Sequence, residues 1–318
     1  MSKICLDLNA KLNLDTVRTA VESGADCFDS ENLFFGHGTA TAIDEAAYLV
    51  SFAMGDSPLI PEYKIDTKLS DSQKDKIVFL FQSRIIEKIP ASYITNEAWF
   101  AGYQFYVDER VLIPRSPIAE LITDKFLPWV QWGNTENVKT VLDLCTGSGC
   151  IAIATALTLP DVNVHASDIS TDALDVAKIN IDNYELFNRV SLIKSDVFNQ
   201  IEPFQYDIIL SNPPYVDAAD MLNLPIEFLA EPKLGFEAGT NGLDIVIPML
   251  CNAGSYLTDN GIIIVEVGNS AVTLQQMLPE VPFTWLEFEY GGDGVFLLDV
   301  SQIRKYHHLF EHLLMQKW

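Results

Sequence analysis

A strand, a turn and a helix in the middle of the chain carry the first residues that could do chemistry. The apolar run 141–144 contains Asp143, and the turn after it contains Thr146, Gly147 and Gly149 before an alanine-rich apolar stretch. Glycines permit positive φ and a close approach of backbone to ligand, and a helix N-terminus offers free N–H groups. The spacing matches neither the dinucleotide fingerprint nor a P-loop. Because Asp143 would repel a pyrophosphate, a cationic or hydroxyl-bearing cofactor such as S-adenosylmethionine fits better; a plain strand-to-helix turn is the alternative.

Two further aspartates stand at the ends of the next two expected strands. Asp168 lies about twenty residues beyond the glycine turn, where an acid commonly bonds ribose hydroxyls, and Asp196 ends the third strand in the same way. A single aspartate at such a place is more often a turn former. Three at successive strand ends favour a ligand site at the carboxyl edge of a parallel sheet. The predicted cofactor-binding residues are Asp143, Thr146, Gly147, Gly149, Asp168, Ile169, Asp196, Val197 and Asn212.

The most specific motif is Asn212-Pro213-Pro214-Tyr215, which follows the fourth expected strand. The Asn212 side chain offers an acceptor oxygen and an NH2 donor, while the prolines fix φ, carry no N–H and stiffen the loop. The Asn212 oxygen and the Pro213 carbonyl can together accept both hydrogens of one planar NH2 group. An Asn-Pro-Pro sequence also makes a plain turn, but its place directly after a strand favours a site. We predict Asn212, Pro213 and Tyr215 as catalytic residues.

The reaction that these groups favour is methyl transfer to an amide or ring amino nitrogen. Such a nitrogen is a weak nucleophile because its lone pair is delocalised, so orientation and proximity matter more than a strong base. Hydrogen bonds to the two acceptors favour a pyramidal nitrogen as positive charge develops, and the proton can leave to water afterwards. The lack of a conspicuous His or Cys nucleophile agrees with this chemistry. The predicted substrate-binding residues are Phe100, Arg115, Asn212, Pro213, Pro214 and Tyr215.

The charge limits the partners. The chain of 318 residues has 44 acidic and 20 basic side chains and a net charge of −24, so sequence-independent binding to a nucleic-acid backbone is not expected. A basic partner is favoured, because a negative field speeds its encounter; acidity that serves only solubility is the alternative. Five cysteines without metal-ligand spacing indicate neither a metal site nor a disulfide framework. The sequence shows no signal peptide and no apolar run of membrane-spanning length, and we expect a cytoplasmic protein.

The expected elements divide the chain into a helical part, a hairpin and an α/β part. Helices are predicted at 12–21, 41–54 and 70–88. Strands at 99–107 and 111–113, joined by a turn at 108–110, predict a β-hairpin that is either a structural strap or the wall of a substrate site. Nothing up to residue 90 indicates chemistry. We therefore predict a helical substrate-docking domain at 1–92, a hairpin linker at 93–116 and a catalytic domain at 117–318.

From residue 139 onward, apolar strand candidates alternate with helices. This alternation predicts a mostly parallel, doubly wound sheet with right-handed crossovers. The last two strands are separated only by 289–293, which is too short for a helix, so the final strand should lie antiparallel. Seven strands with one reversed strand are the arrangement of the Rossmann-like class I methyltransferases. The strand candidates are 141–144, 162–166, 190–193, 206–210, 261–267, 283–288 and 294–298, and the helix candidates are 151–158, 171–186, 243–257 and 271–278.

Several stretches carry a resemblance to a known family; they are 96–102, 114–121, 143–150, 281–288 and 291–294. On these residues the chain resembles, from about 91 to 298, the protein-(glutamine-N5) methyltransferases. Within that family it is similar to the branch that modifies ribosomal proteins. The branch that modifies release factors usually has Pro-Arg-Pro-Asp-Thr-Glu where this chain has Pro-Arg-Ser-Pro-Ile from Pro114, and Gly at the position of Cys145.

The resemblance implies an activity and a partner. Enzymes of the ribosomal-protein branch methylate a glutamine side-chain amide on the large-subunit ribosomal protein L-three, a basic protein, with S-adenosylmethionine as the methyl donor. It also implies that Asn212 and Pro213 hold the glutamine amide, and that the N-terminal helices help to dock the protein substrate. The alternatives are glutamine methylation of release factors, adenine-N6 methylation of nucleic acid, which would need a basic groove, and a non-catalytic ribosome-assembly factor.

Overall fold

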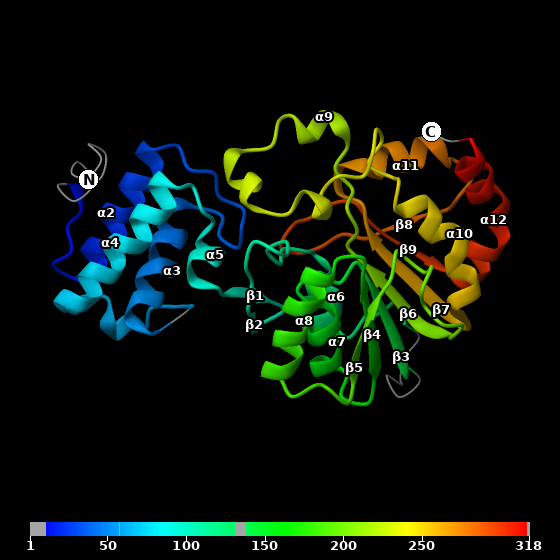
Figure 1. Cartoon of the computed structure of the whole chain (residues 1–318), viewed down its shortest axis with the longest axis horizontal. Helices are drawn as coiled ribbons and strands as arrows, with labels where there is room; N and C mark the ends of the chain where they lie inside the picture. Colours follow the sequence, from blue (N-terminus) through cyan, green and yellow to red (C-terminus); the bar gives the residue numbers. More distant parts are fainter. Residues whose placement is uncertain (1–10, 57, 131–137, 317–318) are drawn as a thin grey trace. The chain divides into compact units, whose positions relative to one another are not determined.

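The computed structural model describes residues 11–56, 58–130 and 138–316. By the contacts among its residues the chain forms two compact units. The helical unit comprises the residues up to Ala98 together with the segment Pro225–Ala230, and the sheet unit comprises Trp99–Leu224 and the residues from Glu231 onward. The helical unit is therefore discontinuous in sequence, and its second piece comes from the middle of the chain (Figure 1).

Three long helices build the helical unit, and a hydroxyl side chain caps each of them. Thr16, Thr41 and Ser70 each accept a hydrogen bond from the backbone N–H three residues further on. Gly24 allows close packing, because a Cβ there would lie 2.4 Å from the Phe81 ring. The helices of this unit are α2 (Val17–Ser30), α3 (Ala42–Met54), α4 (Asp71–Ile86) and α5 (Ala91–Thr95), with the 3-10 helices η1 (Glu62–Lys64) and η3 (Ile226–Ala230).

The helix predicted at 12–21 is wrong in both bounds. Helix α2 begins only at Val17, because Thr16 and Thr19 form a capping box that fixes its N-terminus. It then continues to Ser30 and buries Phe28 on its inner face. The helices predicted at 41–54 and 70–88 correspond to α3 and α4.

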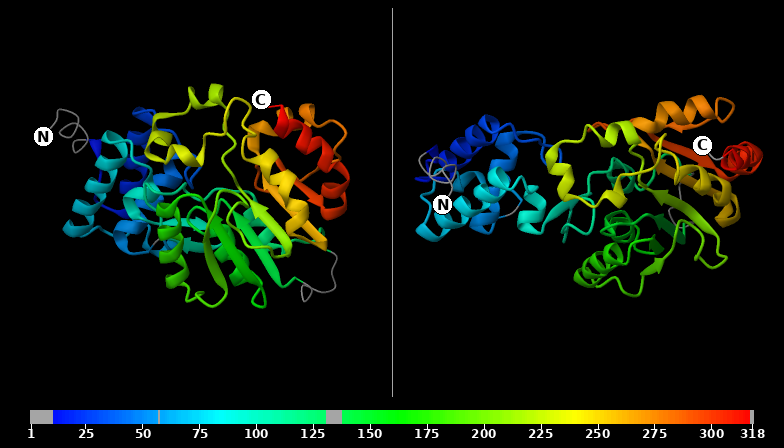
Figure 2. Two further views of the ribbon diagram at one scale, coloured as in Figure 1. Left: turned by 45° about the vertical axis from the view of Figure 1, so that its right-hand side comes forward. Right: turned by 45° about the horizontal axis from the view of Figure 1, so that its top comes forward.

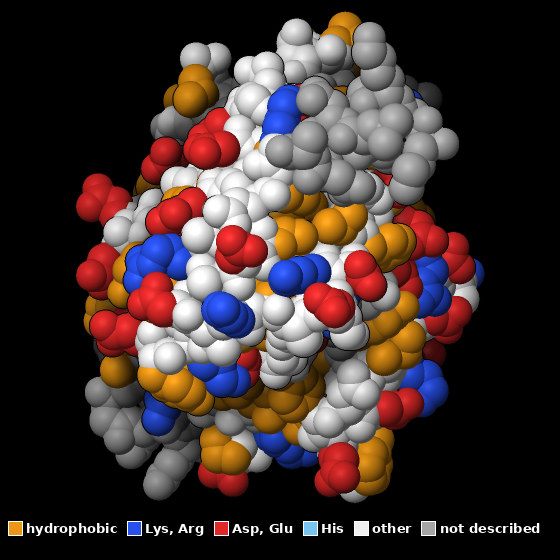
Figure 3. Space-filling view, turned by 90° about the vertical axis from the view of Figure 1, so that its left-hand side faces the viewer, with side chains coloured by type: hydrophobic (Ala, Val, Ile, Leu, Met, Phe, Trp, Pro, Cys, Tyr) orange, Lys and Arg blue, Asp and Glu red, His pale blue; other side chains and the backbone are white. Residues whose placement is uncertain are grey.

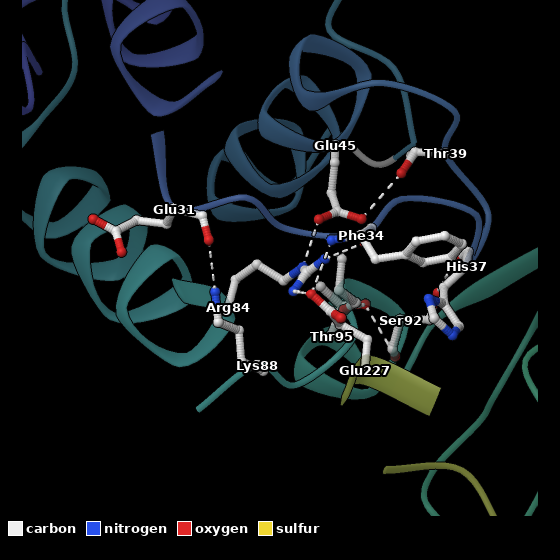
Figure 4. A network of polar contacts seen from close by, with 11 residues as sticks. Glu31, Phe34, His37, Thr39, Glu45, Arg84, Lys88, Ser92, Thr95 and Glu227 are labelled. Carbon is white, nitrogen blue, oxygen red and sulfur yellow. Dashed lines mark hydrogen bonds and ion pairs between the residues drawn. The ribbon is translucent and has the colours of Figure 1, made fainter. Parts of the chain in front are cut away.

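A fully buried arginine joins three parts of the helical unit (Figure 4). Arg84 of α4 donates from Nε to Glu45 Oε1 of α3 at 2.6 Å, and from Nη2 to the Phe34 carbonyl at 2.7 Å. Its Nη1 lies 3.4 Å from Oε1 of Glu227 in η3, and the same oxygen accepts the Phe34 N–H at 2.9 Å. Buried charges are tolerated only when they are paired and hydrogen-bonded. The cluster therefore fixes η3 against α3 and α4.

The β-hairpin differs from the predicted one. Its strands are β1 (Ala98–Phe100) and β2 (Tyr103–Phe105), and they are joined by Ala101 and Gly102 with φ of 50° and 81°. Two central residues with positive φ form the tight turn that matches the twist of a hairpin. A turn is present at the predicted 108–110, where the Val111 N–H donates to the Asp108 carbonyl at 3.1 Å, but the predicted second strand at 111–113 is wrong. The Ile113 N–H donates instead to the carboxylate of Glu231, at 2.9 Å.

The sheet unit contains one seven-stranded sheet in the order β5-β4-β3-β6-β7-β9-β8. Pairings from β5 through β7 are parallel, while β9 lies antiparallel to both β7 and β8. The predicted fold class, a mostly parallel sheet with a reversed last strand, is confirmed. The strands are β3 (Thr140–Leu144), β4 (Asn163–Asp168), β5 (Val190–Lys194), β6 (Tyr206–Ser211), β7 (Leu257–Glu266), β8 (Thr284–Trp285) and β9 (Val295–Asp299).

Helices cover both faces of the sheet (Figures 1 and 2). Successive side chains of a strand point to opposite faces, so Val141 of β3 packs into one apolar cluster with α6 and α7, while Leu142 packs into a second with α10 and α12. The longer helices of this unit are α7 (Cys150–Thr158), α8 (Thr171–Asn183), α10 (Val246–Tyr256) and α12 (Val300–Met315). The shorter ones are α6 (Ile118–Thr123), α9 (Ala218–Met221), α11 (Ala271–Met277), η4 (Lys233–Gly235) and η5 (Gly268–Ser270).

The two units differ in charge. The helical unit has 16 acidic and 9 basic residues, whereas the sheet unit has 28 acidic and 11 basic ones. On the face that lies to the left in Figure 1, Lys and Arg side chains are scattered among Asp and Glu (Figure 3). The described part of this face therefore offers no continuous positive surface. Within the ranges that the structure describes, no helix has the length and apolar character needed to cross a membrane.

Candidate active site

The candidate site lies at the carboxyl ends of β3, β4, β6 and β7. Strand β3 pairs with β4 on one side and with β6 on the other, both parallel. The chain proceeds from β3 outward to β4 and β5 and then returns to β6, so the direction of winding reverses between β3 and β6. Such a switch point is where open α/β sheets bind ligands.

Asp143, the penultimate residue of β3, is completely buried. Its Oδ2 accepts hydrogen bonds from the Thr146 hydroxyl at 2.5 Å and from the Ala152 N–H at 3.2 Å. Its Oδ1 has no hydrogen-bond partner among the described residues. Burial raises the pKa of Asp143 to about 7, and the nearby charge of Asp168 adds to the rise. A buried carboxylate oxygen without a partner is unusual, and it is suited to receive a cationic or hydrogen-bond-donating ligand.

The turn after β3 has the glycine-dependent backbone that the sequence indicates. Cys145, Gly147 and Gly149 all have positive φ, at 59°, 55° and 80°. A Cβ on Gly149 would lie 3.2 Å from Ala177, so this glycine lets α7 and α8 pack closely. A Cβ on Gly147 would meet nothing within 4 Å, so the turn is open on that side. The open side of the turn gives a ligand direct access to the backbone.

Asp168 is the last residue of β4 and faces the same turn. Its Oδ2 accepts the Gly147 N–H at 2.9 Å, and its Oδ1 accepts the Ser170 N–H at 2.8 Å. Burial raises the pKa of Asp168, against the opposing effect of these backbone hydrogen bonds. Each carboxylate oxygen keeps a further lone pair for a ligand hydroxyl. Ile169, the next residue, has a side chain that is 49 % exposed.

Asp196 has a different environment from the other two aspartates. It lies two residues beyond β5, is exposed, and accepts a hydrogen bond from the Asn199 amide at 3.1 Å. Its own N–H donates to Gln200, and Val197 after it has a φ of 48°. The structure thus brings Asp143, Asp168 and the glycine turn into direct contact, while the hydrogen bonds of Asp196 to described residues are with Asn199 and Gln200 of its own loop.

The Asn212 motif directly follows β6. The Ser211 hydroxyl donates to the Leu144 carbonyl at 2.8 Å, which joins the ends of β6 and β3. Asn212 is partly exposed and Pro213 is buried. No other described residue is hydrogen-bonded to the Asn212 side chain. An amide that is free of internal hydrogen bonds can use both its donor and its acceptor toward a ligand.

Tyr215 is held at both ends. Its hydroxyl donates to Oε1 of Glu266, the last residue of β7, at 2.8 Å, and its carbonyl accepts from the Ser270 hydroxyl at 2.8 Å. The other oxygen of Glu266 accepts the Ser116 hydroxyl at 2.5 Å. A Cβ on Gly268 would lie 2.5 Å from the tyrosine ring, so the ring requires glycine there. Burial and then the charge of Glu266 raise the pKa of Tyr215, which favours a positioning role over that of a base.

Two acidic residues of this region were not predicted. Glu266 ends a neighbouring parallel strand just as Asp143 and Asp168 do, and this common placement is the signal that could have identified it. Glu231 is buried and accepts two hydrogen bonds from the Arg115 guanidinium, both at 3.0 Å. It directly follows η3 and not a strand, so it carries no such signal.

The remaining two predicted substrate residues have structural partners. Arg115 is bound to Glu231 and to the Ile113 carbonyl. Phe100 is buried in the core of the sheet unit, edge-to-face with Phe105 at 6.4 Å between ring centroids. Their role toward a substrate stays a prediction. Among the described residues, no group of His, Cys, Asp and Glu has the arrangement of a metal site.

Three features together define a Rossmann-like methyltransferase. They are the mixed sheet with one reversed strand, the glycine turn between two acids at strand ends, and the Asn-Pro-Pro-Tyr loop. Residues 130–234 match the family model of the methyltransferase small domain. The ribosomal protein uL3 glutamine methyltransferase of Francisella tularensis subsp. tularensis is 44% identical over 299 residues, which are 94% of this chain and 95% of that one. The enzyme of the same name from Neisseria meningitidis serogroup A is 45% identical over 296 residues, covering 92% and 96%. The chain belongs to the family of ribosomal protein uL3 glutamine methyltransferases.

One solved structure that matches part of the chain is the ribosomal protein L11 methylase of Lactobacillus delbrueckii subsp. bulgaricus. It is 21% identical, with a TM-score of 0.36, and the match covers 52% of this chain and 70% of that one. The resemblance predicted from the sequence and the assignment as a methyltransferase enzyme are both confirmed by the two uL3 relatives.

Proposed function

We propose that this protein transfers the methyl group of S-adenosylmethionine to the side-chain amide nitrogen of a glutamine in ribosomal protein uL3. The observation that carries the proposal is the free amide of Asn212 beside Pro213, at the same sheet edge as the unpartnered oxygen of Asp143. Membership of the uL3 glutamine methyltransferase family supports the choice of substrate. The sheet unit, with 28 acids and 11 bases, suits a basic ribosomal protein.

The residues present fit S-adenosylmethionine. Asp143 Oδ1 is a buried acceptor without a partner, which a cationic group of the cofactor would satisfy. Asp168 offers carboxylate lone pairs for ribose hydroxyls, and the open side of Gly147 allows the cofactor to approach the backbone. We assign Thr146, Gly149 and Ile169 to the walls of the same site, with Asp196 and Val197 at its rim. When bound, the cofactor supplies an electrophilic methyl group.

The residues of the chain then act on the glutamine amide. The Asn212 side-chain oxygen and the Pro213 carbonyl accept its two N–H groups and orient the nitrogen. These hydrogen bonds strengthen as the nitrogen loses its conjugation and gains positive charge, so they stabilise the transition state more than the ground state. Tyr215 keeps the loop in place through Glu266 and Ser270. The product nitrogen is strongly acidic while it is cationic, and its proton leaves to water.

The proposed substrate also sets the place of action. Ribosomal proteins are made and assembled in the cytoplasm, and we propose that the enzyme works there. If the enzyme methylated release factors instead, uL3 would stay unmodified. An experiment can therefore distinguish the two substrates.

The test uses purified protein and labelled S-adenosylmethionine. Ribosomal proteins from cells that lack the gene are incubated with the enzyme, and uL3 is digested and analysed by tandem mass spectrometry. We expect one additional methyl group on a glutamine side chain of uL3, and no such group on uL3 from the untreated sample. Label on release factors or nucleic acid with unmodified uL3 would overturn the proposal, and so would the absence of any transfer.

A further inference from the structure

The 3-10 helix η3 presents different residues to the interior and to water. Glu227 points inward to Arg84 (Figure 4) and is 2% exposed. By contrast, Ile226 and Leu229 are 60% and 72% exposed. Side chains three residues apart lie above one another in a 3-10 helix. Ile226 and Leu229 therefore form one aliphatic ridge on the outer side of η3.

The inner side of η3 is anchored at two successive residues. Glu227 accepts the Phe34 N–H and pairs with Arg84, as described above. The Phe228 ring packs on Phe34 and on His37, with ring centroids 5.3 and 4.5 Å apart. The orientation of the short helix is thus fixed by buried polar and aromatic contacts. Holding two aliphatic side chains in water gains nothing for folding, since apolar surface is stabilised by burial.

The ridge is connected to the Asn212 motif through a short stretch of chain. Nine residues, 216–224, separate Tyr215 from Pro225. Directly after Tyr215, the Val216 N–H donates to the Phe236 carbonyl at 2.8 Å, and the Val216 carbonyl accepts the Ala238 N–H at 3.1 Å. These two hydrogen bonds close a loop, residues 216–238, which begins directly after the motif and contains η3.

We propose that Ile226 and Leu229 are a contact surface for the polypeptide that carries the acceptor glutamine, and that the Arg84–Glu227 pair keeps this surface in place. The inference rests on the function proposed above, and it assigns two contact residues to that substrate. The partner is a basic protein, because a chain with a net charge of −24 attracts one. Apolar side chains of that polypeptide would pack on the ridge, as they commonly do on exposed apolar surface in protein recognition.

The first experiment replaces the ridge. The double variant Ile226→Ser/Leu229→Ser is compared with wild type by initial rates on intact uL3, with cofactor affinity measured separately by calorimetry. We expect KM for uL3 to rise about tenfold, with kcat and cofactor affinity unchanged. The matched control is Leu59→Ser, which alters an aliphatic residue of the same unit that is 77% exposed but lies outside η3. The control should behave as wild type.

The second experiment releases the anchor while keeping the ridge. In Glu227→Ala the charge of Arg84 still has Glu45 as its partner at 2.6 Å, so the helical core keeps a compensated ion pair. Hydrogen exchange of the 225–230 amides should accelerate, and KM for uL3 should rise as in the double variant. The conservative variant Glu227→Gln retains an acceptor oxygen and should recover most of the wild-type KM.

The outcomes separate this inference from the proposed function. If wild type methylates uL3 and the double variant has the same KM, the ridge is not a contact surface and the inference is wrong. If KM rises equally in Leu59→Ser, the effect is not specific to η3, which also overturns it. If wild type itself transfers no methyl group to uL3, the proposed function has failed, and the inference, which rests on it, fails with it.

Discussion

In the helical unit the buried carboxylates of Glu45 and Glu227 share the guanidinium of Arg84, whereas in the sheet unit the equally buried Asp143 has only a hydroxyl and an N–H as hydrogen-bond donors. Burial raises the pKa of Asp143. A buried carboxylate that is paired with a cation of the same chain needs no ligand to compensate its charge. One without a cation is stable only as the neutral acid or with a ligand that supplies positive charge or hydrogen bonds. The comparison therefore distinguishes acids that hold structure from acids that belong to a site.

The largest effect is expected where the cation is removed from the helical unit. Arg84→Met leaves two buried carboxylates without a cation to compensate their charge and should lower the free energy of unfolding of this unit by about 3–5 kcal/mol. Hydrogen exchange of the α3 and α4 amides measures the change. Arg18→Met, which breaks an exposed pair with Asp66, is the control and should leave exchange unchanged. Equal protection of these amides from exchange in both variants would show that the buried ion pair does not stabilise the helical unit.

The next effect is on catalysis and belongs to the sheet unit. Asn212→Ala removes one acceptor for the glutamine amide and should reduce kcat by about a hundred- to a thousandfold, with cofactor affinity close to normal. Single-turnover kinetics on uL3, with separate calorimetry of the cofactor, gives both quantities. Asn252→Ala on α10, an exposed amide outside the site, is the control. Turnover of Asn212→Ala within a few-fold of wild type would contradict the amide-orienting role.

A smaller effect is expected for the second acid of the site. Asp168→Ala removes the acceptor proposed for the ribose hydroxyls and should weaken cofactor binding by roughly 1.5–3 kcal/mol while the fold persists. Calorimetry with S-adenosylmethionine measures this loss. Asp161→Ala, at an exposed position before β4, provides the comparison. An unchanged affinity in Asp168→Ala would remove this residue from the site.

The last effect concerns Asp143→Asn, which should raise the free energy of unfolding, whereas Arg84→Met should lower it. The pKa of folded Asp143 is about 7 against an ordinary value of 3.8, so between these pH values the folded protein binds a proton that the unfolded chain has lost. The free energy of unfolding of the cofactor-free protein therefore falls as the pH rises from about 4 to 7. Asp143→Asn should remove this dependence and stabilise the cofactor-free protein at pH 8.

The same variant should also lose affinity for the cofactor, and wild-type affinity should decrease as the pH falls below 7. Thermal unfolding and calorimetry between pH 5 and 8 test both statements. Destabilisation of Asp143→Asn at pH 8 would show that Asp143 is a structural acid like Glu45, and the distinction between the two units would not hold.

The strands of the sheet were predictable because each is a short apolar run with a recognisable end. Asp143 and Asp168 were found for the same reason, since strand ends in a parallel sheet meet at one edge. The hairpin was misplaced because Ala101 is not a residue type that signals positive φ, and Gly102 alone did not outweigh the Asp-Glu-Arg sequence that follows. Helix α12 begins with a capping box of Asp299 and Gln302 that was not recognised as a helix start.

The Arg84 cluster could not be predicted from local pattern at all. Arg84 and Glu227 are 143 positions apart, and each alone resembles an ordinary charged residue. A buried ion pair between distant residues becomes visible only when the fold brings them together. The predicted domain boundaries and the assignment of each site residue to cofactor or substrate stay predictions for the same reason, since they depend on partners that sequence spacing does not specify.

The discontinuity of the helical unit also has a consequence for the order in which the protein is completed during its synthesis. Helices α2 to α5 leave the ribosome first, but the carboxylate of Glu227 and the ring of Phe228 follow only after the strands up to β6 have been made. Domains generally fold as units in the order of their synthesis. Here the N-terminal unit is completed by η3, a piece of chain from beyond the Asn212 motif, so its last buried contacts can form only after much of the sheet unit has been synthesised.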